Sequence, residues 1–390
     1  MSVATFDVAA ARERFSSLRS GFAFLDAPGG TQVPDEVGEA IAAALRDASG
    51  NLGAPYATGR AVESILAGAK ADAGRFLGCS ADEIAFGMNM TTLNFAVSRA
   101  AGRDFREGDQ IVTTQLDHDG GVAPWVELAA DKGMEVVVAN ATEGLTIDYE
   151  DLERKLSDRT RVVAFALASN ATGSVADAQR ICRLAREAGA LSWIDAVHYA
   201  AHEPVDVAEL GCDVLLCSPY KFCGPHLGIA YLRAEAAGAW RPYKARPSSS
   251  SQLGRRFETG TLPYELLAGF RATIAYLDSI GGMETLRDYE RSLGERFLAG
   301  LPDAVILYGP PTMAERVPTF LLNVEGVEAE TAARALAERG LGVWYADNWY
   351  CVALGERLPT SSLRVGFIHY NTNAEVDRLV DELTALAAAR

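Results

Sequence analysis

The 390-residue sequence lacks the long apolar run of a membrane protein, because no stretch of 18 consecutive apolar residues occurs in it. It is also poor in positive charge: 36 Lys and Arg residues stand against 52 Asp and Glu, a net charge of −16. An acidic chain disfavours non-specific nucleic-acid binding, so we expect a soluble protein without nucleic-acid or membrane partners. Met1–Phe15 lacks the basic start and apolar stretch of a signal peptide.

Cysteine is scarce, and the six residues of this type form no CxxC pair and match no zinc pattern. We therefore expect reduced thiols, no metal site and a cytoplasmic location. Two nucleotide signatures are absent as well, because no GxGxxG turn follows the first strand of the repeating unit and no GxxxxGKS or GxxxxGKT loop occurs. These absences count against a nicotinamide-dependent oxidoreductase and against a nucleotide hydrolase.

Short apolar runs alternate with amphipathic helices from about residue 81 to residue 232. This alternation predicts an α/β fold with a mainly parallel sheet that helices cover on both faces. The seven expected strands are Ile84–Phe86, Gln110–Thr114, Glu135–Ala139, Arg161–Leu167, Leu191–Ile194, Val214–Cys217 and Gly228–Leu232.

A different pattern begins near Leu262 and predicts a smaller α+β domain. Its expected elements are helices at Tyr264–Ser279, Met283–Ala299, Ala329–Arg339 and Ala374–Ala388, with strands at Thr319–Val324, Gly342–Tyr345 and Leu363–Phe367. We expect residues 1–20 to pack as an N-terminal segment on this small domain (263–390), with residues 21–262 as the large domain. The serine run Ser248–Ser251 is expected to form an exposed loop.

Two residues of chemical interest follow expected strands. Lys221 comes just after Val214–Cys217 and is either a solvated loop residue or an amine that a lowered pKa makes nucleophilic. Asp195 ends the strand at Leu191–Ile194, either as a surface or capping residue or as the partner of a pyridinium nitrogen. The intervening chain accommodates one helix and one strand, which places both residues at the sheet edge where ligands bind.

Three further strand-end sites fall at this edge. Asn89–Asn94 opens an apolar helix, where Thr91 and Thr92 either hold a phosphate or cap the helix. His118 is either an exposed histidine or a flat ring stacked on a cofactor. Asn170 either caps a turn or donates to a phenolic oxygen. Five polar strand-end sites in one α/β domain favour a shared ligand site over coincidence.

The order and spacing of these residues resemble class V aminotransferases of pyridoxal-5′-phosphate (PLP) fold type I, most closely the cysteine desulfurase-like and isopenicillin N epimerase-like branch. The resemblance rests on the ordered set Thr91-Thr92, His118, Asn170, Asp195–His198 and Ser218–Lys221, and it extends from Phe24-Leu25-Asp26 to Tyr370-Asn371-Thr372. It implies PLP as the cofactor, an amino acid as the substrate and a homodimer as the assembly.

The resemblance also implies a role for each matching residue. Lys221 would carry PLP covalently and later move the protons of the substrate. Asp195 would pair with the ring nitrogen and His118 would stack on the ring, so these three would be catalytic. Further cofactor contacts would come from Thr91, Thr92, Asn170, His198 and Ser218, and from Thr261 across the subunit interface. Arg364 would bind the substrate carboxylate, a task that suits a bidentate guanidinium.

The reaction stays open among several outcomes. A persulfide-forming desulfurase needs a mobile loop cysteine before the substrate-binding arginine. Counting from Val343, the usual position falls near Trp349, whereas Cys351 comes about two residues late between Tyr350 and Val352. We therefore expect C–S or other β-bond cleavage of cysteine or a cysteine-derived substrate. The alternatives are epimerisation, transamination, a desulfurase that uses Cys351, and a non-catalytic PLP-binding module.

Overall fold

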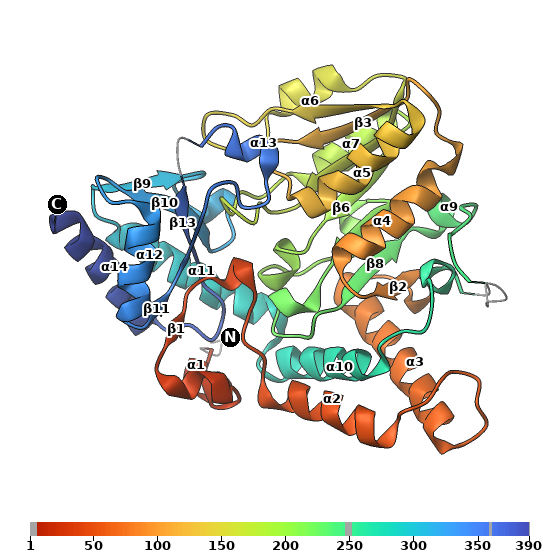
Figure 1. Ribbon diagram of the computed structural model, residues 1–390, viewed down its shortest axis with the longest axis horizontal. Helices are drawn as coiled ribbons and strands as arrows, with labels where there is room; N and C mark the ends of the chain where they lie inside the picture. The colour runs from red at the N-terminus through yellow and green to blue at the C-terminus, as the bar shows by residue number, and fades with distance from the viewer. Residues whose placement is uncertain (1–5, 246–251, 359–360, 390) are drawn as a thin grey trace, which may run out of the picture.

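The computed structural model describes residues 6–245, 252–358 and 361–389 (Figure 1). The serine run Ser248–Ser251 lies outside the described residues. The larger body is built on a seven-stranded sheet with the strand order β2-β8-β7-β6-β5-β3-β4. β8 runs antiparallel to both of its neighbours, β2 and β7, and all other adjacent strands of this sheet are parallel, so the mainly parallel sheet that the sequence predicts is confirmed. The strands are β2 (Ile84–Gly87), β3 (Gln110–Thr114), β4 (Glu135–Ala139), β5 (Thr160–Ala166), β6 (Leu191–Asp195), β7 (Val214–Cys217) and β8 (Gly228–Leu232).

Helices cover both faces of this sheet, which explains why most of its strands are apolar runs without alternation. Ile194 of β6 packs into one core with side chains of α3, α7 and α10, while its neighbour Trp193 packs into a second core with α4 and α5. Fully burying a side chain of this size contributes about 1.5–3 kcal/mol. These covering helices are α3 (Ala57–Leu77), α4 (Met90–Ala101), α5 (Asp119–Lys132), α7 (Ala178–Glu187) and α10 (Tyr264–Ser279).

The smaller body has an antiparallel sheet in the order β12-β13-β10-β9, packed against α11, α12 and α14. Its elements are α11 (Gly282–Gly300), β9 (Val305–Tyr308), β10 (Thr319–Val324), α12 (Ala329–Glu338), β12 (Trp344–Ala346), β13 (Ser362–Gly366) and α14 (Asn373–Ala388). Shorter helices are α1 (Val8–Glu13), α2 (Asp35–Asp47), α6 (Tyr149–Lys155), α8 (Val207–Leu210), α9 (Ala234–Ala237) and α13 (Val352–Gly355).

Two features of the smaller body depart from the sequence prediction. The single strand expected at Gly342–Tyr345 is two elements, β11 (Leu341–Gly342) and β12, which belong to different sheets. β11 pairs in parallel with β1 (Ala23–Phe24) near the N-terminus. A two-residue strand carries no readable period, so this long-range pairing left no pattern in the sequence.

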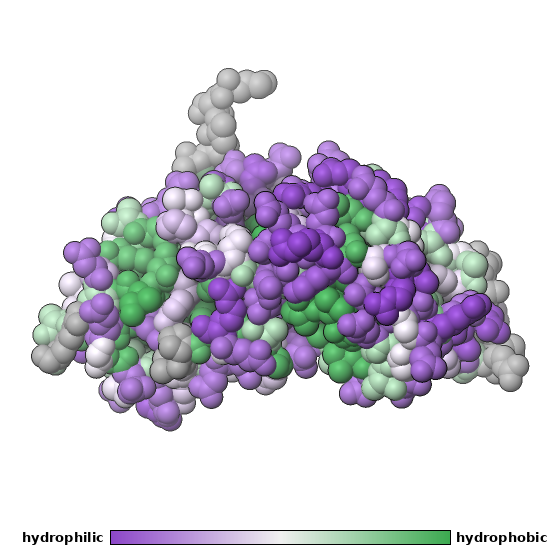
Figure 2. Space-filling model, turned by 90° about the horizontal axis from the view of Figure 1, so that it is seen from above, coloured by the Kyte–Doolittle hydropathy of each residue, from purple (hydrophilic) through white to green (hydrophobic). Residues whose placement is uncertain are grey.

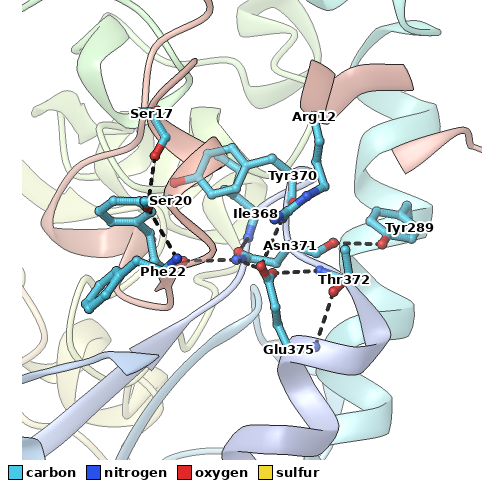
Figure 3. Close-up of polar contacts among 11 residues, drawn as sticks. Arg12, Ser17, Ser20, Phe22, Tyr289, Ile368, Tyr370, Asn371, Thr372 and Glu375 are labelled. Atoms are coloured by element: carbon cyan, nitrogen blue, oxygen red, sulfur yellow. Dashed lines mark hydrogen bonds and ion pairs between the residues drawn. The ribbon is translucent and has the colours of Figure 1, made fainter. Parts of the chain in front are cut away.

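The segment before β1 contacts the C-terminal part of the chain (Figure 3). The Arg12 guanidinium donates to the carbonyl of Tyr370 at 2.5 Å and pairs with Glu375 at 3.0 Å. The Tyr289 hydroxyl donates to the carbonyl of Asn371 at 2.7 Å. These contacts agree with the predicted docking of the first residues on the small domain, whose boundaries stay a prediction.

Hydrophilic residues predominate on the face seen in Figure 2, and hydrophobic residues gather there in separate patches. In the described part of the chain, no helix combines the length and apolar character that a membrane span requires.

Candidate active site

Strand ends from the larger body meet residues of the smaller body around a cavity of about 250 Å³. Eight of the predicted site residues line it: Thr91, His118, Asn170, Asp195, His198, Ser218, Lys221 and Arg364. Thr92 and Thr261 line a neighbouring cavity instead. The carboxyl ends of the parallel strands therefore assemble the predicted site, as open α/β sheets commonly do.

Lys221 ends a short 3₁₀ turn, Pro219–Lys221, directly after β7. Its side chain is buried, and its Nζ donates a hydrogen bond to the carbonyl of Pro28. Burial, and to a smaller extent the positive charge of Arg364, lowers the pKa of this amine to about 7, against opposing effects of Asp26 and Asp195. A substantial fraction of the amine is thus neutral and nucleophilic at physiological pH.

Asp195 is the last residue of β6 and lies at the floor of the same cavity. Burial raises the pKa of its carboxyl group to about 6, while a hydrogen bond from Val197 N at 2.9 Å and the charge of Lys221 oppose the rise. At neutral pH the group is still mostly ionised, and a nearby cation would hold it so.

The amino end of α4 reaches the cavity through Met90 and Thr91. Asn89 caps this helix by accepting a hydrogen bond from Thr92 N at 2.8 Å, and Met90 N donates to Ser218 Oγ at 3.3 Å. A side chain at Gly120 would approach Thr91 Oγ1 to 2.8 Å, so this glycine permits the close approach of the α5 and α4 ends. The N–H and the hydroxyl of Thr91, which lines the cavity at this helix start, suit a phosphate.

His118 caps α5 by accepting a hydrogen bond from Gly120 N at its Nδ1, 2.9 Å away. Burial, with smaller contributions from Lys221 and Arg364, lowers the pKa of the imidazole to about 4. The ring is therefore neutral at pH 7, and its centroid lies 5.7 Å from that of Tyr350. The imidazole of His118 is neutral and its Nδ1 is occupied by the hydrogen bond from Gly120 N. The ring is therefore better suited to stacking on a flat cofactor than to transferring a proton.

His198 leaves one buried polar atom without a partner in the described structure. Its Nε2 bonds Thr319 Oγ1 at 2.9 Å, whereas its Nδ1 is buried and has no hydrogen-bond partner. Burial holds the pKa of the ring well below its usual range, so the ring is neutral. Such an orphaned atom beside the cavity calls for a polar ligand group, because burying it unpaired is costly.

These residues fit PLP. The orphaned nitrogen of His198 suits the phenolic oxygen, the helix start at Thr91 suits the phosphate, and Asp195 suits a protonated ring nitrogen. Lys221 supplies an amine for the aldehyde, and the cavity has room for a flat ring beside His118. The chemistry of the donor set therefore matches this cofactor at each of its polar positions.

Arg364 of β13 enters the cavity from the smaller body. Its guanidinium packs against two aromatic rings, with its carbon 4.3 Å from the Trp349 centroid and 5.5 Å from that of Trp344. Nε and Nη2 donate to the two carboxylate oxygens of Asp26 at 2.7 and 3.0 Å, and Nη1 donates to Asn170 O at 3.2 Å. These contacts hold the cation in one orientation.

The loop before α13 lies over the cavity and is tied to Asn170. Trp349 and Tyr350 both have φ near +57°, a conformation that costs about 1–3 kcal/mol for each such residue. The side-chain amide of Asn170 donates to Trp349 O at 3.0 Å and accepts from Cys351 Sγ at 3.0 Å. The predicted bond from Asn170 to a phenolic oxygen must therefore use its second amide hydrogen.

Sequence reasoning assigned no role to the segment 26–31, although Asp26 formed part of the quoted resemblance. Pro28 and Gly29 line the cavity, and Tyr220, beside Lys221, lines it as well. The signal was present in the acidic residue followed by Pro28-Gly29-Gly30, a combination that lets a backbone approach other groups closely.

Comparisons with known proteins agree with this geometry. The aminotransferase class-V family model matches residues 23–379. A probable cysteine desulfurase 2 of Mycobacterium leprae is 32% identical, covering 97% of this chain and 96% of that protein. The apo structure of a cysteine desulfurase from Thermococcus onnurineus superimposes with a TM-score of 0.92 at 24% identity, covering 100% of both chains.

A further solved structure, at a TM-score of 0.85 and 19% identity, is a C-DES mutant that carries glycine covalently linked to its PLP cofactor, with 95% of this chain and 98% of that chain covered. Structural likeness at such identity shows a shared fold, while the family match extends over almost the whole chain. This chain therefore belongs to the class V aminotransferase family and is a PLP-dependent enzyme.

Proposed function

We propose that this protein is a cysteine desulfurase-like C–S lyase that acts on cysteine or a cysteine-derived amino acid and releases sulfur directly to solvent. The observation that carries the proposal is one cavity that joins Lys221, Asp195 and Arg364, while Cys351 stays buried beside it. The Mycobacterium leprae relative, a probable cysteine desulfurase, supports the substrate class.

Each of the cavity residues has a separate role in the proposed reaction. Bound PLP supplies an electron sink for the substrate's α-carbon. Arg364 binds the α-carboxylate, and the neutral amine of Lys221 removes the α-proton as a general base. Asp195 holds a proton on the ring nitrogen. The β-carbon–sulfur bond then breaks and sulfide leaves, so that cysteine and water yield sulfide, pyruvate and ammonia.

The mouth of the cavity is aromatic. Trp344 is 46% exposed and Tyr350 is 67% exposed, yet both line the cavity. Apolar rings of this kind favour a substrate whose side chain is larger or less polar than that of cysteine itself. S-substituted cysteines are therefore the first substrates to test beside cysteine.

Product analysis tests the proposed reaction. The purified PLP-loaded protein is incubated with cysteine and a panel of S-substituted cysteines, and we expect equal amounts of pyruvate and of sulfide or thiol. Alanine with protein-bound sulfur would identify a persulfide-forming desulfurase. Racemised substrate would identify an epimerase, and a keto acid that retains sulfur would identify an aminotransferase; each of these outcomes contradicts the lyase.

Replacing Cys351 with alanine should leave sulfur release within about threefold of the wild-type rate. Its thiol is fully buried and donates to Asn170 Oδ1, and burial raises its pKa, so little reactive thiolate exists near pH 7. Sulfide release from cysteine is the measurement, with Cys182→Ala, another buried thiol, as the control. A persulfide on Cys351, together with loss of sulfur release in a variant that retains PLP, would overturn the lyase proposal.

We also propose a homodimer, and with it a site shared between subunits. Thr261 is exposed and lines the cavity that Thr92 also lines, away from Lys221. A residue so placed is free to reach the phosphate site of a second copy, as the family resemblance implies. All six cysteines are free thiols, which supports a cytoplasmic location as part of the same proposal.

Sedimentation at micromolar concentration should give twice the chain mass of 41.6 kDa. Because the proposed contact needs the partner subunit, Thr261→Ala should weaken PLP retention in the dimer, measured by dialysis against PLP-free buffer. Thr285→Ala, which removes a hydroxyl of α11 outside this cavity, provides the control. A monomer with full activity would remove Thr261 from the site.

A further inference from the structure

The segment Asp26–Thr31 connects the two charged groups of the active site. At one end, the Asp26 carboxylate makes the paired hydrogen bonds to Arg364 described above. In the middle, the carbonyl of Pro28 accepts the hydrogen bond from Lys221 Nζ. At the other end, Thr31 N donates to Tyr220 O at 3.1 Å, and Thr31 Oγ1 accepts from Cys223 N at 2.8 Å.

The backbone of Asp26 is fixed to the strand that carries Arg364. Asp26 forms a parallel bridge with Gly366 of β13, and Gly366 N donates to Leu25 O at 2.8 Å. Just before it, the Asn371 side chain, placed among its neighbours in Figure 3, donates to Phe24 O at 2.9 Å. Hydrogen bonds therefore fix the backbone of Asp26 beside Arg364, which restricts where its carboxylate can lie.

The contacts of Arg364 decide which of its edges a substrate can use. A guanidinium has five N–H groups. Asp26 takes the Nε–H and one N–H of Nη2, and Asn170 O takes one N–H of Nη1. Among the described residues, this leaves one N–H on Nη1 and one on Nη2 without an acceptor, so the Nη1/Nη2 side of the guanidinium has donors for a second carboxylate.

We propose that Asp26 is the positioning residue for Arg364: it fixes the guanidinium so that the Nη1/Nη2 edge receives the α-carboxylate of the amino-acid substrate. This inference rests on one part of the proposed function, the binding of the substrate carboxylate by Arg364. It does not depend on cleavage of the C–S bond. Arg364 is 3% exposed, so without Asp26 its buried charge loses its counter-ion and turns away from this orientation.

Binding of an unreactive amino acid tests this role without any chemistry at sulfur. The PLP-loaded wild type and Asp26→Asn are titrated with alanine and with ethylamine, its counterpart without a carboxylate, and dissociation constants are taken from the visible absorbance of the bound cofactor. We expect Asp26→Asn to weaken alanine binding about 10- to 100-fold and to leave ethylamine binding within twofold. Equal weakening of both ligands, or unchanged or tighter alanine binding, would overturn the proposal.

A second variant disturbs the pair of Asp26 and Arg364 without removing a charge. A side chain at Gly29 would collide with the Asp26 carboxylate and come within 3.3 Å of Arg364 Nη2. Gly29→Ala should therefore reproduce the selective loss of alanine binding. The control is Asp377→Asn, which breaks a similar two-bonded pair with Arg296 on the exposed surface and should change neither ligand.

A double-mutant cycle distinguishes an effect of Asp26 on the position of Arg364 from a general disturbance of the active site. In an Arg364→Gln background, Asp26→Asn should cause no additional loss of alanine affinity, because its effect acts through the guanidinium. Additive losses would show that Asp26 acts elsewhere and would also overturn the proposal. If the protein binds alanine as expected but releases no sulfide from cysteine, the lyase proposal fails while this one stands.

Discussion

Replacing Lys221 with alanine is expected to lower amino-acid turnover roughly 10²- to 10⁴-fold, because the variant loses the base that moves the α-proton. In the wild type, reduction with borohydride should fix a pyridoxyl label on Lys221, identified by peptide mapping. The buried amine beside Pro28 is placed in the cavity and has a pKa near neutrality, which are the two properties that the covalent link requires.

Lys70 offers the matched control for this labelling. It is also buried, and burial lowers the pKa of its amine, although the charge of Glu258 opposes the shift. Its Nζ lies 2.9 Å from Glu258 Oε1 and donates to Ile84 O at 2.6 Å, outside the cofactor cavity. Label on Lys70 with none on Lys221 would refute the site assignment.

The pH dependence of PLP capture by the cofactor-free protein provides a second readout. With a pKa of about 7, the neutral fraction of Lys221 rises about tenfold between pH 6 and pH 8 and then levels off. An ordinary lysine, with a pKa of about 10.4, would show a rise of about 100-fold over this range and no plateau. Stopped-flow absorbance after mixing with PLP distinguishes the two curves.

Asp195→Asn should lower the turnover number roughly 10²- to 10³-fold while most of the PLP is retained, since the carboxylate acts on charge that develops during the reaction. The amide keeps the shape of the side chain and its hydrogen bond from Val197 N, but it lacks the negative charge that favours a protonated ring nitrogen. The turnover number and the bound PLP per chain are measured together.

Asp119→Asn is the control for this variant, because Asp119 also follows a strand of the large sheet but does not line the cavity. It should retain activity within about twofold. Turnover near the wild-type rate in Asp195→Asn, or loss of PLP without a change in the turnover number of the remaining holoenzyme, would contradict the role given to Asp195.

The large sheet could be predicted because most of its strands are buried apolar runs bounded by polar or glycine-containing turns. β3, β4, β7 and β8 coincide with their predicted bounds. The positions of Lys221 and Asp195 followed from the same reasoning, since a residue just after a parallel strand must lie at the ligand-binding edge. Local periodicity and chain direction sufficed for these elements.

The remaining features depend on contacts between distant residues. Nothing near Asp26 in the sequence indicates that its partner is Arg364, because a bridge to β13 brings them together. The hydrogen bond from the Asn170 amide to Trp349 O likewise depends on a loop that contains two residues of positive φ. Such pairings carry no periodic signal, so sequence patterns alone could not predict them.

The pairing of β1 with β11 has a consequence for how the enzyme is made. Ala23 is synthesised well before its partner Leu341, because the two residues are 318 positions apart in the sequence. The contacts of Asp26 with β13 can therefore form only after the smaller body has been synthesised. All seven strands of the large sheet are thus synthesised before Arg364, the residue proposed to bind the substrate carboxylate, so the amino-acid site is the last part of the cavity to become complete.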